Sequence, residues 1–139
     1  MVDLVVLKGG NSLEKDIAIK TFQNVIKNLD SLKYNISIIE MNCFDPINFI
    51  NTLKSLEFKN TRSHNCPIVA LNLLHGGAGE DGTIQGFLDM LNIKYIGSNA
   101  LSSGICMDKN LTKTILKANN IPVVEQILLD FNNFISLNI

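Results

Sequence analysis

The segment from His75 to Gly82, which reads HGGAGEDG, concentrates the groups most able to do chemistry. It directly follows an apolar run, PIVALNLL, that ends at Leu74. A strand that ends in a glycine-rich polar loop and feeds a helix places reactive side chains at the carboxyl edge of a sheet. A histidine there can bind a carboxylate or relay a proton. The segment predicts a ligand-binding loop, while a structural histidine and helix-capping by Glu80 and Asp81 would be the simpler explanation of each residue alone.

A second glycine turn, KGGNSLE at residues 8–14, follows the apolar run at residues 2–7. Its glycines let a ligand approach the backbone, and the amino terminus of the next helix offers free N–H groups that favour anions. Glu14 changes this prediction, because a carboxylate beside a phosphate is repulsive, whereas it would pair well with a substrate ammonium group. The alternative is that Glu14 interacts with the helix dipole and that Ser12 or Asn11 caps the helix.

Other polar positions carry weaker indications. The turn after residue 8 lacks the third glycine of a Gly-x-Gly-x-x-Gly fingerprint, so a nucleotide-dependent oxidoreductase is the least favoured function. Lys109 and Lys113 follow Asp108 near the start of a predicted helix, where a lysine could reach a phosphate from a neighbouring domain or simply line a solvated face. His64 stands in a polar stretch, residues 59–66, and is expected to be exposed and inert.

Strand and helix patterns alternate along the chain. Apolar runs predict strands at residues 2–7, 34–41, 68–74 and 92–98, and extended structure again at 121–129. Helices are predicted from about 12 to 29, 45 to 56, 83 to 91, 99 to 106 and 109 to 117. The first should pack on the sheet through Ile17, Phe22, Val25, Ile26 and Leu29. This alternation predicts an α/β fold, a Rossmann-like open parallel sheet with helices on both faces.

Composition restricts the function classes. A chain of 139 residues with a net charge of −1 is expected to be one domain without a global field for nucleic acid or anionic membranes. No apolar run approaches the roughly 18 residues of a membrane span, and the start of the chain lacks signal-peptide features, so we expect a cytoplasmic protein. Cys43, Cys66 and Cys106 form no Cys-x-x-Cys pair, and no metal site is expected.

In order along the chain, these motifs resemble the amino-terminal, pre-ATP-grasp domain of D-alanine–D-alanine ligases, ATP-grasp enzymes of peptidoglycan biosynthesis. The resemblance rests on GGNSLE at 9–14, HGGAGEDGTIQG at 75–86, YIGS at 95–98, MDK at 107–109 and IPV at 121–123. It covers nearly all of residues 2–128 and implies that this domain occupies residues 1–128. Residues 129–139 would then be the truncated start of the following ATP-grasp segment.

The resemblance implies a role for each matching residue. Glu14 would be the catalytic-site group that holds the amino group of the first D-alanine, with His75 near that substrate's carboxylate and Gly76 and Glu80 in the same substrate site. Lys109 would contribute to the ATP site. In such ligases ATP phosphorylates one D-alanine to an acylphosphate, which the amine of a second D-alanine attacks, and Mg²⁺ ions offset the charge of the phosphates. In this chain Ala18 replaces a short polar residue that is usual in the family.

The resemblance also implies limits. The ATP-grasp domains that carry ATP, the magnesium ligands and an oxyanion-stabilising arginine would lie beyond this chain, so residues 1–139 alone are expected to bind neither ATP nor Mg²⁺ tightly and to be inactive. The implied partners are D-alanine and, as a homodimer, a second copy of the chain. The alternative is a non-catalytic remnant or dimerisation module.

Overall fold

A computed structural model describes residues 2–10, 12–41, 45–59 and 68–129, of which residues 56–59 are described by their backbone alone. Its centre is a four-stranded parallel sheet in the order β2-β1-β3-β4. The strands are β1 (Val2–Lys8), β2 (Tyr34–Glu40), β3 (Ile68–Asn72) and β4 (Lys94–Ile96). Because parallel neighbours need crossover connections, this order confirms the predicted alternation of strands and helices.

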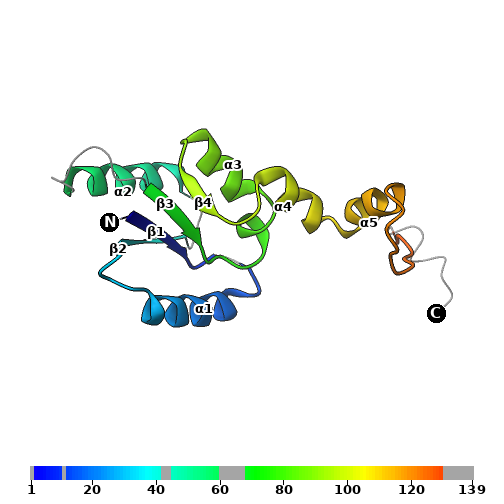
Figure 1. The fold of residues 1–139 in the computed structure, drawn as a ribbon, viewed down its shortest axis with the longest axis horizontal. Helices are drawn as coiled ribbons and strands as arrows, with labels where there is room; N and C mark the ends of the chain where they lie inside the picture. Colours follow the sequence, from blue (N-terminus) through cyan, green and yellow to red (C-terminus); the bar gives the residue numbers. More distant parts are fainter. Residues whose placement is uncertain (1, 11, 42–44, 60–67, 130–139) are drawn as a thin grey trace.

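Helices cover both faces of the sheet. They are α1 (Lys15–Asn28), α2 (Pro46–Lys59), α3 (Thr83–Met90), α4 (Ala100–Met107) and α5 (Lys109–Ala118), with a short 3-10 helix, η1 (Gly77–Gly79). Figure 1 shows α1 on one face and α2 and α3 on the other. The predicted Rossmann-like α/β fold, with an open parallel sheet between helices, is therefore confirmed.

Strand β1 is the centre of the hydrophobic core, because its side chains are buried on both faces of the sheet. Val5 and Leu7 join Phe49 of α2 and Leu88 of α3 in one cluster. Leu4 and Val6 belong to a second cluster, against which α1 packs. An apolar run with no alternation is what burial on both sides requires.

The face of α1 that contacts the sheet differs from the prediction in one residue. Ile17 is 56% exposed, whereas Ala18 is fully buried. The other four predicted contacts are correct: Phe22, Val25, Ile26 and Leu29 pack against the core. Ala18 lies one turn before Phe22 on the same stripe, and Ile17 is rotated from Ala18 by about 100° of helix. Ala18 is thus the buried residue of this turn, where the sequence pattern had assigned Ile17.

Short polar side chains cap three of the helices. Asp45 Oδ1 accepts hydrogen bonds from the N–H groups of Ile47 and Asn48 at the start of α2. Asn99 Oδ1 caps α4, and Asp108 Oδ1 caps α5 through the N–H of Leu111. Each cap satisfies a backbone donor that has no partner within its helix, and this fixes where the helix begins.

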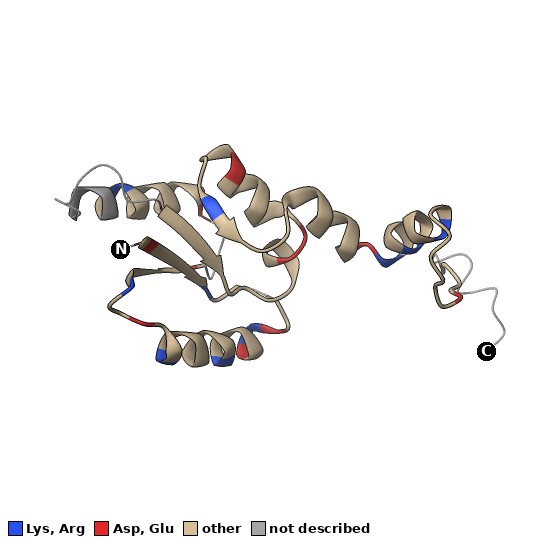
Figure 2. Cartoon of the chain, in the orientation of Figure 1, with Lys and Arg blue, Asp and Glu red and all other residues tan. Residues whose placement is uncertain are grey.

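The carboxyl-terminal part of the described chain departs from the compact body. Figure 1 shows α5 extending beyond α4, away from the sheet, and none of the residues of α5 is buried. Residues 121–129 form neither helix nor strand, so the extended segment predicted there does not join the sheet. Within the described residues, no helix is both long and apolar enough to span a bilayer. Figure 2 shows acidic and basic residues interspersed along the chain.

Two substitutions on α3 test the position of the core. Leu88 is fully buried and Met90 is 87% exposed, although they are two residues apart. We expect Leu88→Ala to lower the free energy of unfolding by about 2–5 kcal/mol through lost burial and an unfilled cavity. Met90→Ala, the matched control, should change it by less than about 0.5 kcal/mol. Urea unfolding followed by circular dichroism measures both, and equal losses would contradict this packing.

Candidate substrate site at the carboxyl edge of the sheet

The order of the strands brings the two glycine-rich loops together. The chain crosses from β1 to β2 on one side of β1 and later returns to β3 on its other side. In the parallel register Leu7 of β1 is level with Asn72 of β3, so the loops after the two strands leave the sheet side by side. A point where successive crossovers go in opposite directions leaves a crevice at the carboxyl ends of the strands, the usual ligand position in open α/β sheets.

One hydroxyl group connects these loops. Ser12 Oγ donates a hydrogen bond to the carbonyl oxygen of His75 at 2.5 Å and accepts one from the N–H of Glu14 at 3.1 Å. One prediction was that Ser12 caps α1, and this is wrong. The helix begins at Lys15, and Glu14 occupies its capping position. The other predicted cap, Asn11, lies outside the described residues. In the sequence, the only indication of this hydrogen bond is that Ser12 stands between the glycine turn and Glu14.

Gly76 allows the two loops to approach closely. Its backbone has φ 67° and ψ 169°, a conformation essentially restricted to glycine. A Cβ atom at this position would lie 3.0 Å from Ser12 Cβ and 3.4 Å from a carboxylate oxygen of Glu14. Gly76 is therefore needed both for its backbone angles and for the space that it leaves to Ser12 and Glu14.

The far end of the loop is held by two amide side chains. Asn72 Nδ2 and Gln85 Nε2 both donate to the carbonyl oxygen of Gly79, at 2.7 and 3.1 Å. Gln85 is 7% exposed, and its Oε1 has no hydrogen-bond partner in the described part of the chain. The two donors fix the backbone immediately before Glu80. Sequence analysis had not assigned either side chain a role.

The two adjacent acids of the loop have different functions. Asp81 Oδ1 accepts a hydrogen bond from the N–H of Thr83, the first residue of α3, at 2.9 Å, while the capping position itself is occupied by Gly82. Glu80 makes no such bond among the described residues, and its side chain is exposed. The turn that leads into α3 therefore uses the carboxylate of Asp81 and leaves the carboxylate of Glu80 available.

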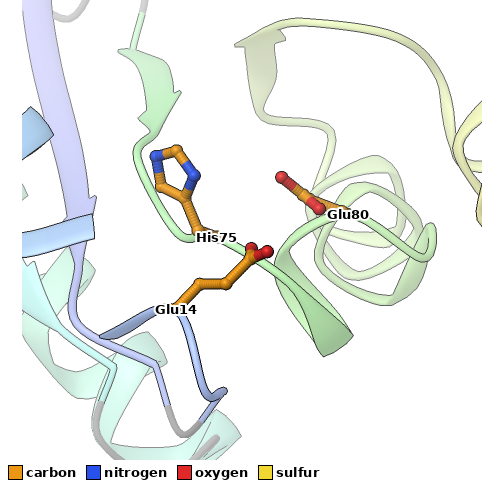
Figure 3. Close-up of side chains that lie close together, drawn as sticks. All are labelled: Glu14, His75 and Glu80. Carbon is orange, nitrogen blue, oxygen red and sulfur yellow. The ribbon is translucent and has the colours of Figure 1, made fainter. Parts of the chain in front are cut away.

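Glu14, His75 and Glu80 converge. One carboxylate oxygen of each glutamate and one ring nitrogen of His75 all lie within 4.8 Å of one another. Figure 3 shows them coming from the start of α1, the loop after β3 and the segment before α3. Both glutamates are exposed, His75 is partly buried, and none of the ion pairs found within the described residues involves them. Two uncompensated carboxylates favour a cationic group, and an imidazole beside them can bind a carboxylate.

Lys109 does not belong to this cluster. It is the first residue of α5 and is exposed, and α5 lies beyond α4 from the sheet (Figure 1). His64, Cys43 and Cys66 lie outside the described residues, so the prediction of an inert His64 stays a prediction. Cys106 is a free, exposed cysteine. The structure thus brings together three of the predicted site side chains and places Gly76 beside Glu14, whereas the predicted ATP-site lysine lies apart from them.

Comparison with known proteins shows what the chain is similar to. Residues 48–98 match the family model described as "D-ala D-ala ligase N-terminus". The chain is 46% identical over 116 residues to a D-alanine–D-alanine ligase of Bacillus anthracis, and the match covers 84% of this chain and 34% of that protein. The corresponding match to D-alanine–D-alanine ligase B of Clostridium perfringens is 40% identical, with the same coverage. The chain carries the amino-terminal domain of the D-alanine–D-alanine ligase family. It spans about a third of the length of these curated relatives.

Solved ligases share the fold. A B. anthracis D-alanine–D-alanine ligase complexed with ATP superposes with a TM-score of 0.75 at 38% identity, over 100% of this chain and 46% of that one. The Coxiella burnetii ligase gives a TM-score of 0.69 at 33% identity, over 90% of this chain and 44% of that one. A D-Ala:D-Ser ligase from Enterococcus faecalis, at 22% identity and a TM-score of 0.71, shows the shared fold alone. The structural similarity to the B. anthracis ligase therefore extends through α4 and α5, beyond the segment matched by the family model.

Adjacent glycines test the close approach of the loops. Gly76 and Gly77 both have positive φ, at 67° and 49°, but nothing would lie within 4 Å of a Cβ at Gly77. We expect Gly77→Ala to lower the free energy of unfolding by about 1–2 kcal/mol through backbone strain alone. Gly76→Ala should cost more, about 2–4 kcal/mol, because its strain is greater and the new methyl meets Ser12. Urea denaturation of the two variants compares them, and equal costs would show that the loops are not in contact there.

Proposed function

We propose that this chain is the substrate-binding lobe of a D-alanine–D-alanine ligase and that D-alanine lies between Glu14 and the 75–80 loop. The observation that carries the proposal is the convergence of Glu14, His75 and Glu80 at the carboxyl edge of the sheet. The similarity to D-alanine–D-alanine ligases supports the choice of substrate, since this chain shares their amino-terminal fold. The whole reaction, formation of D-alanyl-D-alanine from two D-alanines with ATP hydrolysis to ADP and phosphate, belongs to this proposal.

The chemistry of a zwitterionic amino acid matches the cluster. Its ammonium group needs anionic acceptors, which Glu14 and Glu80 supply. Its carboxylate needs a hydrogen-bond donor, and a ring nitrogen of His75 lies within 4.8 Å of the glutamate oxygens. Charge-assisted hydrogen bonds of this kind are about twice as strong as neutral ones, and their directions fix the orientation of the bound molecule. Glu14 would therefore hold the first D-alanine by its amino group, which leaves the carboxylate as the group that reacts.

The phosphates of ATP do not fit this cluster. Phosphates beside Glu14 and Glu80 would be repelled, and no lysine or arginine ion pair offsets these acids in the described part of the chain. We propose that ATP, with the magnesium ions that would neutralise its phosphates, binds elsewhere in the complete ligase. Lys109, exposed at the first turn of α5, is the residue of this chain proposed to reach it. A cytoplasmic homodimer is part of the same proposal.

The alternative function, a non-catalytic remnant or dimerisation module, would not require a substrate site. The discriminating property is saturable binding of D-alanine. A dimerisation surface alone would give no binding that depends on Glu14. The following experiment separates the two functions.

Glu14→Gln should weaken binding of D-alanine to the 139-residue chain by at least about tenfold, because it removes a hydrogen-bonded charge pair worth about 1.5–3 kcal/mol. Asp16→Asn is the matched control: Asp16 is an exposed acid in the first turn of the same helix and lies outside the cluster. Titration with D-alanine, followed by chemical shifts of backbone amides, measures both affinities. Unchanged affinity in Glu14→Gln, or no saturable binding by the parent chain, would contradict the proposal.

A second experiment concerns turnover. We expect residues 1–139 alone to release no ADP above background when mixed with D-alanine, ATP and Mg²⁺. Phosphoryl transfer depends on cations positioned around the phosphates, and the carboxylate-rich cluster supplies none. A coupled assay for ADP measures the rate, with a full-length D-alanine–D-alanine ligase as the positive control. Sustained turnover by this chain would show that its site includes an ATP-binding function that the proposal omits.

A further inference from the structure

We propose that Glu14, His75 and Glu80 also form a binding site for a divalent transition-metal cation such as Zn²⁺, and that the bound cation competes with the ammonium group of the substrate. Metal binding is a property of the three side chains themselves. Only the competition rests on the proposed function. No metal site was expected from the sequence, because its three cysteines form no Cys-x-x-Cys pair.

The ligand set is suited to such a cation. Zinc binds imidazole nitrogen and carboxylate oxygen at about 2.0–2.2 Å and is often held by three protein ligands, with the fourth position open. The three ligand atoms already lie within 4.8 Å of one another. Coordination would require a contraction to separations of roughly 3–4 Å, set by these bond lengths. The exposed side chains of Glu14 and Glu80 have room to make this adjustment.

Charge favours occupancy by a cation. Neither Glu14 nor Glu80 is ion-paired with a lysine or arginine among the described residues, so a dication would relieve the repulsion between the two carboxylates. Elsewhere in the described chain, Glu40 is paired with Lys8 and Asp30 with Lys33. Unlike Glu40 and Asp30, the cluster therefore retains its negative charge.

The imidazole of His75 makes the site selective for transition metals over Mg²⁺. Neutral histidine suits zinc, copper, nickel and iron, whereas Mg²⁺ prefers carboxylate, carbonyl and water oxygens. The site should therefore bind Zn²⁺ or Co²⁺ in the presence of the millimolar Mg²⁺ that an ATP-dependent ligase assay contains. A transition metal held at Glu14 would occupy the position proposed for the substrate's ammonium group, which makes the same residues a point of inhibition.

The test is a titration of the 139-residue chain with ZnCl₂ by isothermal calorimetry, in the presence of excess Mg²⁺. We expect a stoichiometry of one at this site, and at least about tenfold weaker binding in Glu14→Gln, His75→Asn and Glu80→Gln, since even the outer partners of metal ligands are worth about 10- to 100-fold in affinity. Asp16→Asn and His64→Asn, which change an acid and the other histidine of the chain, are matched controls. Circular dichroism verifies that each variant is folded.

Co²⁺ absorption identifies the ligands. A visible d–d band without a thiolate charge-transfer band supports nitrogen and oxygen ligation, and such a charge-transfer band would assign binding to cysteine instead. Equal Zn²⁺ affinity in the parent chain and the three cluster variants, or no binding, overturns the metal site whatever happens with D-alanine. The competition is tested separately: addition of D-alanine should raise the apparent dissociation constant for Zn²⁺. Zn²⁺ binding without any D-alanine binding would retain the metal site and contradict only the proposed function.

Discussion

The hydrogen bond from Ser12 Oγ to the carbonyl oxygen of His75 is the contact on which the site depends. It joins two loops that are 63 residues apart in sequence and that the sheet alone would only place as neighbours. The same hydroxyl accepts the N–H of Glu14, so a single side chain sets the positions of both a candidate anionic group and the imidazole. This bond requires glycine at position 76, because a methyl group there would clash with Ser12.

The other end of the 75–80 loop is held by a contact with an energetic cost. Gln85 donates to the carbonyl of Gly79, yet its own Oε1 is buried without a partner among the described residues. A buried acceptor left unsatisfied costs about 1–3 kcal/mol. An apolar residue would avoid that cost but would leave Asn72 as the only side chain holding the Gly79 carbonyl. Together the amides of Asn72 and Gln85 fix the shape of the loop before Glu80.

Sequence patterns predicted the elements well, because burial on two faces and helix caps are local properties of the chain. The continuous apolar run of β1 and the helices that begin after Asp45 and Asp108 are examples. Predictions failed where residues distant in sequence determine which side chain is buried or hydrogen-bonded. Ile17 is more apolar than Ala18, but the close packing of α1 on the sheet buries the smaller residue. Ser12 fitted the pattern of a helix cap, and only the adjacency of β1 and β3 shows that its hydroxyl binds His75.

The acids near the amino ends of the helices differ in role according to side-chain length: the aspartates bind backbone N–H groups, and the two glutamates of the site bind none in the described part of the chain. Asp45, Asp81 and Asp108 each accept a nearby backbone N–H, a reach that suits a carboxylate one methylene from the backbone. Glu14 occupies the capping position of α1 without a side-chain cap bond. Glu80 stands beside an aspartate that already binds Thr83. Their additional methylene carries the charge away from the helix end and into the space between the loops, so these two carboxylates remain available to a ligand rather than to the fold.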